Sequence, residues 1–516
     1  MSELPPSGHY QLMAEEIRDA ILEFLRTAGC PTLVEPGEDP LALTPGNYSL
    51  DPAARLTIVA WDDHRTIARR ITAIETAKPG RLQLITEHFG KRAGALTLLD
   101  TARPQTQSHT LKNHRNVFRE VLRRFLSRQF AGWKIAELSA EPDLEHSLSP
   151  AFPRALVRRG TMGWAAIASP PEATDPAACL TYGLIWLHYL RAREPDLTVS
   201  GLAVFVPEGR HRTTARRLRL LDTHKARYSM FVYSEGVHEV AFDPADCGNL
   251  DTDLPIRRRP DGKEHPLLHQ VAALPGVETI AQSDGSLTLR IRGLPFATHR
   301  AGHLLFGLDL RQPASAGTLP EIEALVAELA RLRRPDADAN HPLHRRYPEA
   351  WLESQVRSNL AEIDATLLPD PLYGQVPAFA AGERSVIDLL AADRAGRLTV
   401  IELKASEDPH LPLQALDYWM RVDWHARRGE FSANGYFPDL PLQAQSPRLL
   451  LVSPSLRFHP TAATVIHYFN PSIEVQRVGL GIEWQKRLKV VFRSFGSESS
   501  MWASAQDLPY VDTHFA

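Results

Sequence analysis

The stretch VIDLLAADRAGRLTVIELKASEDPHLPLQALDYW, residues 386–419, decides the fold of the C-terminal part of the chain. Its two apolar runs predict strands, and the DRAGR segment between them predicts the turn of a hairpin. Each run carries one carboxylate, Asp388 or Glu402, and Lys404 follows the second carboxylate by two residues. Because side chains alternate along a strand, Glu402 and Lys404 share one face, and hairpin pairing brings Asp388 near Glu402.

Two carboxylates in a half-buried hairpin repel each other, and burying either one alone costs free energy. A divalent cation removes this conflict, because Mg²⁺ (or Mn²⁺) binds one or two carboxylates together with water and phosphate oxygens. Such a cation would polarise a phosphate and orient a hydroxide nucleophile. Lys404 would hold the attacking water or offset negative charge in the transition state. We therefore predict a metal site at Asp388 and Glu402.

Helices are expected on both sides of the hairpin, and each carries polar residues toward it. The following helix has Gln414 and Tyr418, which lie four residues apart and therefore share one helical face. The preceding helix has Glu353, with Glu349 one turn earlier.

The order Asp388, Glu402-Leu403-Lys404 and Gln414-x-x-x-Tyr418 resembles the PD-(D/E)XK, or restriction-endonuclease-like, superfamily. Within it, the pattern is most similar to RecB-type nucleases and to the archaeal branch- or mismatch-cutting endonucleases. The resemblance covers roughly residues 345–480, and Val-Ile-Asp stands here in place of Pro-Asp.

This resemblance implies a metal-dependent nuclease that hydrolyses phosphodiester bonds in DNA. The two strand carboxylates would be metal ligands, the lysine would be catalytic, and the helix glutamate would support the metal or its water. The glutamine and tyrosine would orient the site or touch the nucleic acid. The catalytic residues that the resemblance implies are Lys404, Glu402, Asp388, Glu353, Gln414 and Tyr418.

Length and element patterns predict a multidomain α/β protein, since 516 residues exceed what one core usually organises. From residue 341 the pattern reads helix, three strands, helix, strand, helix, strand, and its αβββαβ core is the fold that the resemblance implies. The predicted parts are a small mixed α/β domain at 1–105, a second α/β domain at 106–250, a linker with a β-hairpin and a helix at 251–340, the nuclease-like domain at 341–495 and a tail at 496–516.

The 106–250 domain repeats the element order of the 341–495 domain. If the two superpose, Ala166 and Ala168 take the places of Glu402 and Lys404. We therefore expect a degenerate copy of the nuclease-like fold that has lost its metal site. A generic alternation of helices and strands in two unrelated domains is an equal alternative.

Basic residues gather in the same domain, where 20 Lys and Arg stand against 11 Asp and Glu between Arg103 and Arg227. Such a surface holds nucleic acid through its phosphates. The candidate DNA-holding residues there are Arg115, Arg119, Arg123, Arg212, Arg216 and Arg217. Near the predicted metal site, the candidate phosphate contacts are Arg384, Arg421, Arg427 and Arg428.

Other classes of function find little support in the sequence. It has no Gly-x-x-x-x-Gly-Lys-Ser/Thr loop, so we expect no nucleotide cofactor. No apolar run approaches the ~20 residues that cross a bilayer, and no signal peptide is evident, so we expect no membrane partner. Three widely spaced cysteines fit a reducing, cytoplasmic setting.

DNA is thus the expected partner, and a homodimer is open because restriction-like nucleases that cut both strands often pair. One alternative is a catalytically inactive nuclease-fold protein that serves as a nucleic-acid-binding or assembly module. Another is a phosphodiesterase acting on RNA or a small nucleotide, since the site chemistry does not depend on the sugar.

Overall fold

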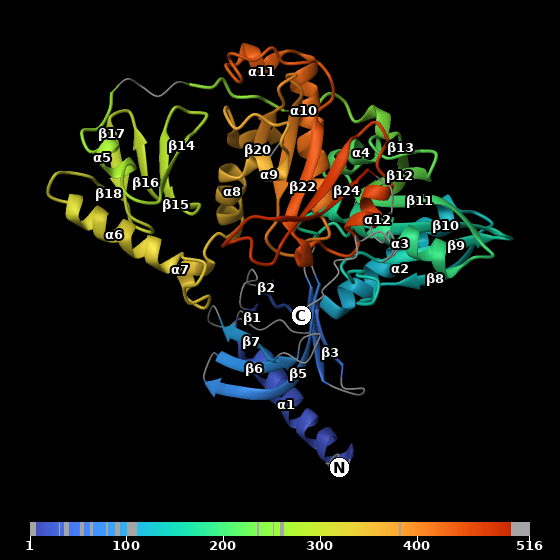
Figure 1. Ribbon diagram of the computed structural model, residues 1–516. Coiled ribbons are helices and arrows are strands. Elements are labelled where there is room, and N and C mark those ends of the chain that lie inside the picture. The colour runs from blue at the N-terminus through green and yellow to red at the C-terminus, as the bar shows by residue number, and fades with distance from the viewer. Residues whose placement is uncertain are drawn as a thin grey trace, which may run out of the picture. The chain divides into compact units, whose positions relative to one another are not determined.

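The computed structural model describes residues 7–29, 31–35, 41–51, 56–61, 66–78, 81–87, 93–100, 111–234, 237–250, 252–258, 263–380 and 383–496. Over these residues the protein is mixed α/β and contains four sheets (Figure 1). The chain divides into two compact units, Met1–Cys247 and Gly248–Ala516, each with two of the sheets. The expected tail, 496–516, lies outside the described residues except for Gly496.

The first unit begins with helix α1 (Ser7–Thr27) and a seven-stranded antiparallel sheet in the order β2-β1-β7-β6-β5-β4-β3. Ile17, Ile21 and Leu25 recur every four residues, so they form one apolar stripe of α1 that packs into the core of this sheet. The strands are β1 (Pro31–Val34), β2 (Leu41–Ala42), β3 (Tyr48–Asp51), β4 (Thr57–Trp61), β5 (Thr66–Lys78), β6 (Arg81–Glu87) and β7 (Ala93–Asp100).

The second sheet of this unit has six strands in the order β8-β9-β10-β11-β12-β13. Phe118, Leu122 and Phe125 of one helix pack against one of its faces. Its strands are β8 (Lys134–Ser139), β9 (Arg154–Arg159), β10 (Met162–Ala168), β11 (Thr198–Pro207), β12 (Arg227–Ser234) and β13 (Val237–Phe242). Its helices are α2 (Leu111–Gln129), α3 (Cys179–Arg193) and α4 (Arg212–Leu218).

In the second unit, the segment expected to be a linker with one hairpin and a helix is a folded β-domain. It forms a five-stranded antiparallel sheet with its own core, which includes Leu289, Phe296 and Ile322. Its strands are short and are joined by tight turns with positive φ, as at Arg292-Gly293, so they leave little continuous alternation in the sequence. Its elements are α5 (Leu268–Ala272), β14 (Val277–Ala281), β15 (Leu287–Ile291), β16 (Leu294–Arg300), β17 (His303–Phe306), β18 (Gln312–Pro313) and α6 (Leu319–Leu332).

The C-terminal sheet has six strands in the order β19-β20-β21-β22-β23-β24. The expected succession of helices and strands occurs here, with β24 added at the edge. Its strands are β19 (Tyr373–Ala380), β20 (Glu383–Ala392), β21 (Leu398–Leu403), β22 (Arg448–Pro454), β23 (Val475–Leu480) and β24 (Val490–Phe495). Its helices are α7 (Pro342–Arg345), α8 (Pro348–Ser358), α9 (Leu360–Ile363), α10 (Leu411–Arg427), α11 (Glu430–Ala433) and α12 (Ala462–His467).

The two six-stranded sheets share one topology. In each, the first three strands pair antiparallel, the third to fifth pair parallel, and the sixth returns antiparallel. Helices α3 and α10 lie between the third and fourth strands of their sheets, with the short α11 following α10, and α4 and α12 lie between the fourth and fifth strands. The shared strand order and directions go beyond a generic alternation of elements, and the internal duplication stays a prediction.

The register corrects the expected correspondence between the copies by one residue. Ala168 pairs with Phe205, two residues before the proline that ends β11, and Leu403 pairs with Val452, two residues before the proline that ends β22. Ala168 therefore corresponds to Leu403. Since neighbours on a strand face opposite sides, the residues at the places of Glu402 and Lys404 are Ile167 and Ser169, not the two alanines.

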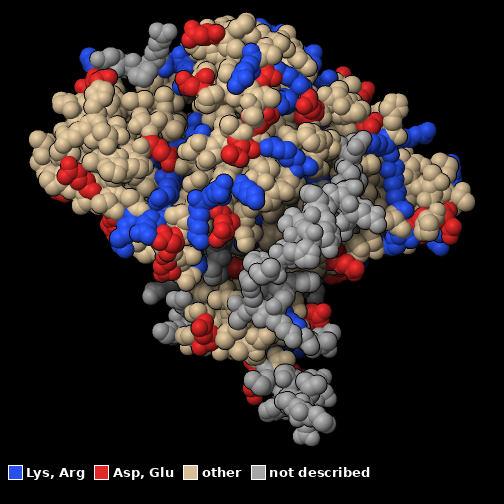
Figure 2. Space-filling model, viewed as in Figure 1, with Lys and Arg blue, Asp and Glu red and all other residues tan. Residues whose placement is uncertain are grey.

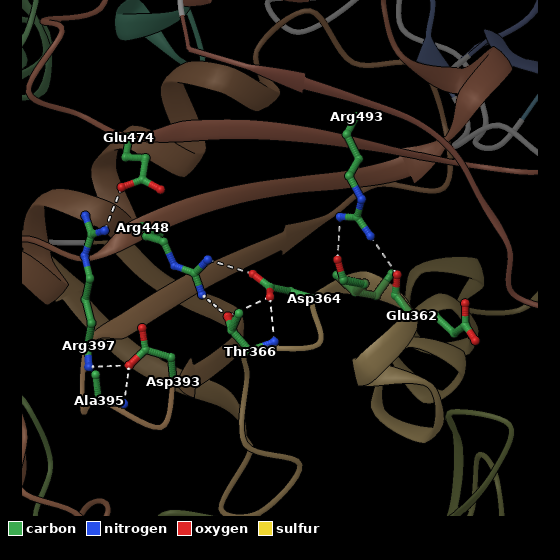
Figure 3. Close-up of polar contacts among 10 residues, drawn as sticks. Glu362, Asp364, Thr366, Asp393, Ala395, Arg397, Arg448, Glu474 and Arg493 are labelled. Carbon is green, nitrogen blue, oxygen red and sulfur yellow. Dashed lines mark hydrogen bonds and ion pairs between the residues drawn. The ribbon is translucent and has the colours of Figure 1, made fainter. Parts of the chain in front are cut away.

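Polar contacts at one end of the C-terminal sheet fix the β20–β21 turn (Figure 3). The Asp393 carboxylate accepts hydrogen bonds from the amides of Ala395 and Arg397, at 2.9 and 3.0 Å. The Arg397 guanidinium pairs with Glu474 at 2.6 Å, and Arg448 pairs with Asp364 at 2.7 Å. Because turn geometry sets hairpin register, these contacts determine which residues face each other across β20 and β21.

A buried charge network joins the five-stranded sheet to helix α8. Arg290 of β15 pairs with Glu278 at 2.8 Å and with Glu353 of α8 at 3.3 Å, and its side chain is 6% exposed. Glu278 also accepts a hydrogen bond from Ser354. The Glu353 carboxylate binds Arg357 as well, at 2.7 Å. The network therefore holds the β-domain and α8 together within the second unit.

Replacing Arg290 with methionine should destabilise the protein by roughly 3 kcal/mol, because buried Glu353 would keep only Arg357 and half-buried Glu278 would lose its ion pair. The matched control is Arg300→Met on the next strand, where the arginine is 70% exposed and lies 3.7 Å from Asp284. The control should cost less than about 1 kcal/mol. Urea unfolding of both variants measures the difference, and equal losses would contradict a central role for Arg290.

Candidate active site

The sheet places the two predicted metal-binding carboxylates opposite each other. Leu389 pairs with Ile401 at the end of the β20–β21 ladder, and Asp388 and Glu402 are the next residue of each strand beyond that pair. Leu389 and Ile401 point into the core beneath α8, so the two carboxylates lie on the other face. The Leu403 amide donates a hydrogen bond to Asp388 Oδ2 at 2.9 Å, so this carboxylate lies where the two strands begin to separate.

Burial opposes ionisation of both carboxyl groups. Burial raises the pKa of Asp388 to about 7, against the opposing pull of the Leu403 amide and Lys404. Burial also raises the pKa of Glu402 well above its ordinary value, and the charge of Asp388 adds to this effect. Glu402 is 8% exposed, and its Oε2 accepts no hydrogen bond from the described residues.

This arrangement fits a divalent cation. A buried carboxylate oxygen that accepts no hydrogen bond is costly, and coordination by a hard cation satisfies it. Asp388 is half-buried, which leaves a path from solvent to the pair. Among the described residues, no group of three or more His, Cys, Asp or Glu side chains is arranged to hold a metal.

Lys404 lies near the two carboxylates, and its amino group stays protonated. Its Nζ pairs with Asp408 Oδ2 at 3.1 Å, and its side chain is half-buried. Burial alone would lower the pKa of Lys404, but the charges of Asp408, Glu349 and Glu402 outweigh it and raise this pKa. Lys404 therefore presents an ammonium group at neutral pH.

Asp408 was not predicted from the sequence as a site residue, although its carboxylate forms the ion pair with Lys404. Its carboxylate accepts a hydrogen bond from the His410 amide at 2.8 Å, in the turn that leads into α10. The Asp-Pro-His sequence before the leucine-rich helix could have indicated Asp408, because aspartate is favoured in turns, where its side chain accepts hydrogen bonds from backbone amides. Near it, burial lowers the pKa of His459 to about 4, so this imidazole is neutral above that pH.

The two glutamates of α8 have different environments. Glu353, the expected helix glutamate, is already bound by Arg290 and Arg357. Glu349, one turn earlier, is only half-buried and raises the pKa of Lys404. Both contribute to the raised pKa of Asp388. The supporting role expected of Glu353 stays a prediction, and the structure adds Glu349 as a second candidate.

Helix α10 brings Tyr418 to the carboxylates. Burial raises the pKa of Tyr418, and the charges of Glu402 and Asp388 raise it further, so its hydroxyl is neutral and can donate a hydrogen bond. The Arg421 guanidinium lies over the Tyr418 ring at 5.8 Å from its centroid. Gln414 lies one turn before Tyr418 and is half-buried, and its part in the site stays a prediction.

Two other candidate phosphate contacts near this site, Arg427 and Arg428, are exposed and already have partners. Arg427 pairs with Asp423 at 2.8 Å and donates to Ser446 Oγ, while Arg428 stacks on Trp424 with its guanidinium 3.3 Å from the ring centroid. The side chain of Arg384 lies outside the described residues. The expected contacts of these arginines with phosphate stay predictions.

The expected basic face of the first unit needs correction. Arg216 and Arg217 are buried, so they cannot form part of a DNA-holding surface. Arg119 and Arg123 both pair with Glu120, at 3.2 and 2.8 Å, which offsets part of their charge. The side chain of Arg115 lies outside the described residues. On the face shown in Figure 2, acidic and basic side chains are interspersed.

Comparisons with known proteins found weak similarity to a solved structure and no related family. No protein-family model and no curated protein matches the sequence. The chain aligns with a solved structure titled "Structure of EndoMS in apo form" at 12% identity. The alignment covers 37% of this chain and 85% of that chain with a TM-score of 0.13, a value that carries no argument. No helix of the described residues has the length and apolar character needed to cross a bilayer.

Without divalent cations, Asp388→Asn should stabilise the protein at neutral pH. The native state holds a proton on Asp388 up to a pKa of about 7, whereas the unfolded chain releases it near its ordinary value of 3.8. Native stability therefore falls as pH rises through that window. The variant should gain roughly 1–3 kcal/mol at pH 8 and less at pH 5.

Thermal and urea unfolding at both pH values, in the presence of a chelator, test this expectation. The control is Asp439→Asn, which removes an exposed carboxylate of the same unit and should leave the pH dependence unchanged. A pH dependence of Asp388→Asn equal to that of the unchanged protein would contradict the assignment.

Proposed function

We propose that this protein is a metal-dependent nuclease that hydrolyses phosphodiester bonds in DNA, with Asp388 and Glu402 as metal ligands and Lys404 as the catalytic lysine. The observation that carries the proposal is the neighbouring pair of carboxylates, buried Glu402 and half-buried Asp388, with an ammonium group beside it. Such a cluster lowers the stability of the native state, and buried groups with strongly shifted pKa values are typical of functional sites. The PD-(D/E)XK-like sequence pattern supplies the reaction class, and its αβββαβ core is the fold assignment that we propose here.

Each residue has a role that follows from its charge. A bound Mg²⁺ or Mn²⁺ would supply the positive charge that polarises the phosphodiester. Lys404 stays protonated, so it would donate a hydrogen bond to a phosphate oxygen or the attacking water and would not act as the base. The neutral Tyr418 hydroxyl would act as a second donor at the edge of the site. Asp408 keeps Lys404 charged and oriented.

A nucleic-acid-binding or assembly protein that keeps the fold without the reaction is the second candidate. Two observations favour it. Glu353 is bound by two arginines, and the described residues hold no cluster of three metal-ligating side chains. Metal binding separates the two candidates, because the nuclease requires it and the scaffold does not.

Purified protein with Mn²⁺ or Mg²⁺ should cut plasmid or labelled DNA, and EDTA should abolish cutting. Lys404→Ala should reduce the rate at least about 100-fold, because a preorganised charge at the phosphate is lost. Lys486→Ala is the matched control, since it removes an exposed lysine that pairs with Glu483. Cleavage that survives in Lys404→Ala would place the activity elsewhere or in a contaminant.

Metal binding can be tested without any substrate. Saturating Mn²⁺ should raise the melting temperature of the native protein, since a ligand present at 100 times its dissociation constant stabilises by about 2.7 kcal/mol. Asp388→Asn should abolish this shift, and Asp439→Asn should retain it. No shift in the native protein, together with salt-sensitive DNA binding, would favour the scaffold over the nuclease.

A further inference from the structure

The hairpin of the first copy has different chemistry at the positions of the proposed metal site. Ile167 of β10 corresponds to Glu402, and the residue opposite Ile167 on β9 is Arg154. Arg154 thus lies where the C-terminal copy has Asp388. No carboxylate occurs on either strand of this hairpin, whose sequences are RALVRR and MGWAAIA.

Arg154 is built into the first copy as a structural cation. It is 4% exposed, its Nη1 donates to the Glu141 carbonyl at 2.9 Å, and its guanidinium lies 5.4 Å from the centroid of the Trp186 ring. Burial lowers its pKa, and the charges of Asp143 and Glu137 oppose that effect. A guanidinium held in this place repels a divalent cation, so this copy cannot bind the metal in the same way.

The lysine position of the first copy is changed as well. The Ser169 amide donates to the Phe205 carbonyl at 2.9 Å, as the Lys404 amide donates to the Val452 carbonyl at 3.0 Å. Ser169 is fully buried, and its own carbonyl accepts a hydrogen bond from the Tyr233 hydroxyl. This position therefore offers no ammonium group and is closed to a phosphate.

From these differences we infer that the chain holds one hydrolytic site and one copy of the fold that cannot hydrolyse, so each binding event cuts one strand of a DNA duplex. The inference rests on the proposed function. Each cut adds one water: its oxygen bonds to phosphorus, the bond from phosphorus to the leaving sugar oxygen breaks, and that oxygen takes up a proton. Cutting the second strand requires a second encounter.

Supercoiled plasmid, incubated with the full-length protein in excess and Mn²⁺, provides the test. Open-circular DNA should accumulate until most supercoiled DNA is consumed, and linear DNA should appear only later. Linear DNA that forms directly, or whose formation rises more steeply with protein concentration than nicking does, would overturn the inference and leave the proposed nuclease standing. Absence of any cut would overturn the proposed function and this inference with it.

Two variants assign the single site to the C-terminal copy. Lys404→Ala should lose nicking at least 100-fold. Ser169→Ala changes the equivalent position and removes only a 3.3 Å hydrogen bond to the Pro170 carbonyl, so it should nick at the native rate. Circular dichroism and melting temperature confirm that each variant is folded. Loss of nicking in a folded Ser169→Ala protein would show that the first copy takes part in hydrolysis and would overturn the inference.

Discussion

The burial of two neighbouring carboxyl groups, Asp388 and Glu402, in one hairpin is the constraint on which the C-terminal candidate site depends. Asp388 and Glu402 both resist ionisation, so the surrounding structure has to hold them in place. The Asp393 turn fixes the register of the hairpin, and Ile401 anchors the opposite face in the core. The stability of the rest of the sheet maintains a local arrangement that is unfavourable without a cation.

The β-domain of the second unit contributes to this arrangement through α8. Arg290 and Glu278 bind the helix at Glu353 and Ser354, and Gly293 lies so close to α8 that a Cβ there would meet the Ala350 carbonyl oxygen at 2.0 Å. The position of α8 sets the distance from Glu349 to Lys404. The β-domain therefore supports the candidate site through α8. The sequence predicted only a linker in this segment, so this supporting role was not expected.

The hairpin, its carboxylates and the order of elements could be predicted because strand alternation and turn residues are local signals. The correspondence between the copies was wrong by one residue, since sequence alone does not fix which face of β10 meets α2. The ion pair between Glu353 and Arg290 joins residues that are 63 positions apart in sequence, so no local pattern could predict it. The burial of Arg216 and Arg217 was equally invisible, because α4 reads as a basic surface helix when its packing is unknown.

The connection between β21 and β22 bears on how this sheet assembles. The β20–β21 hairpin closes across a short turn, whereas the pairing of Thr399 with Arg448 joins strands that are separated in sequence by the whole of α10. Local pairs form faster than distant parallel ones. We therefore expect Asp388 and Glu402 to meet while they are still hydrated, and to lose their water later, when α10 covers them. A cation present during that step would act on the rate of folding as well as on the stability of the final state.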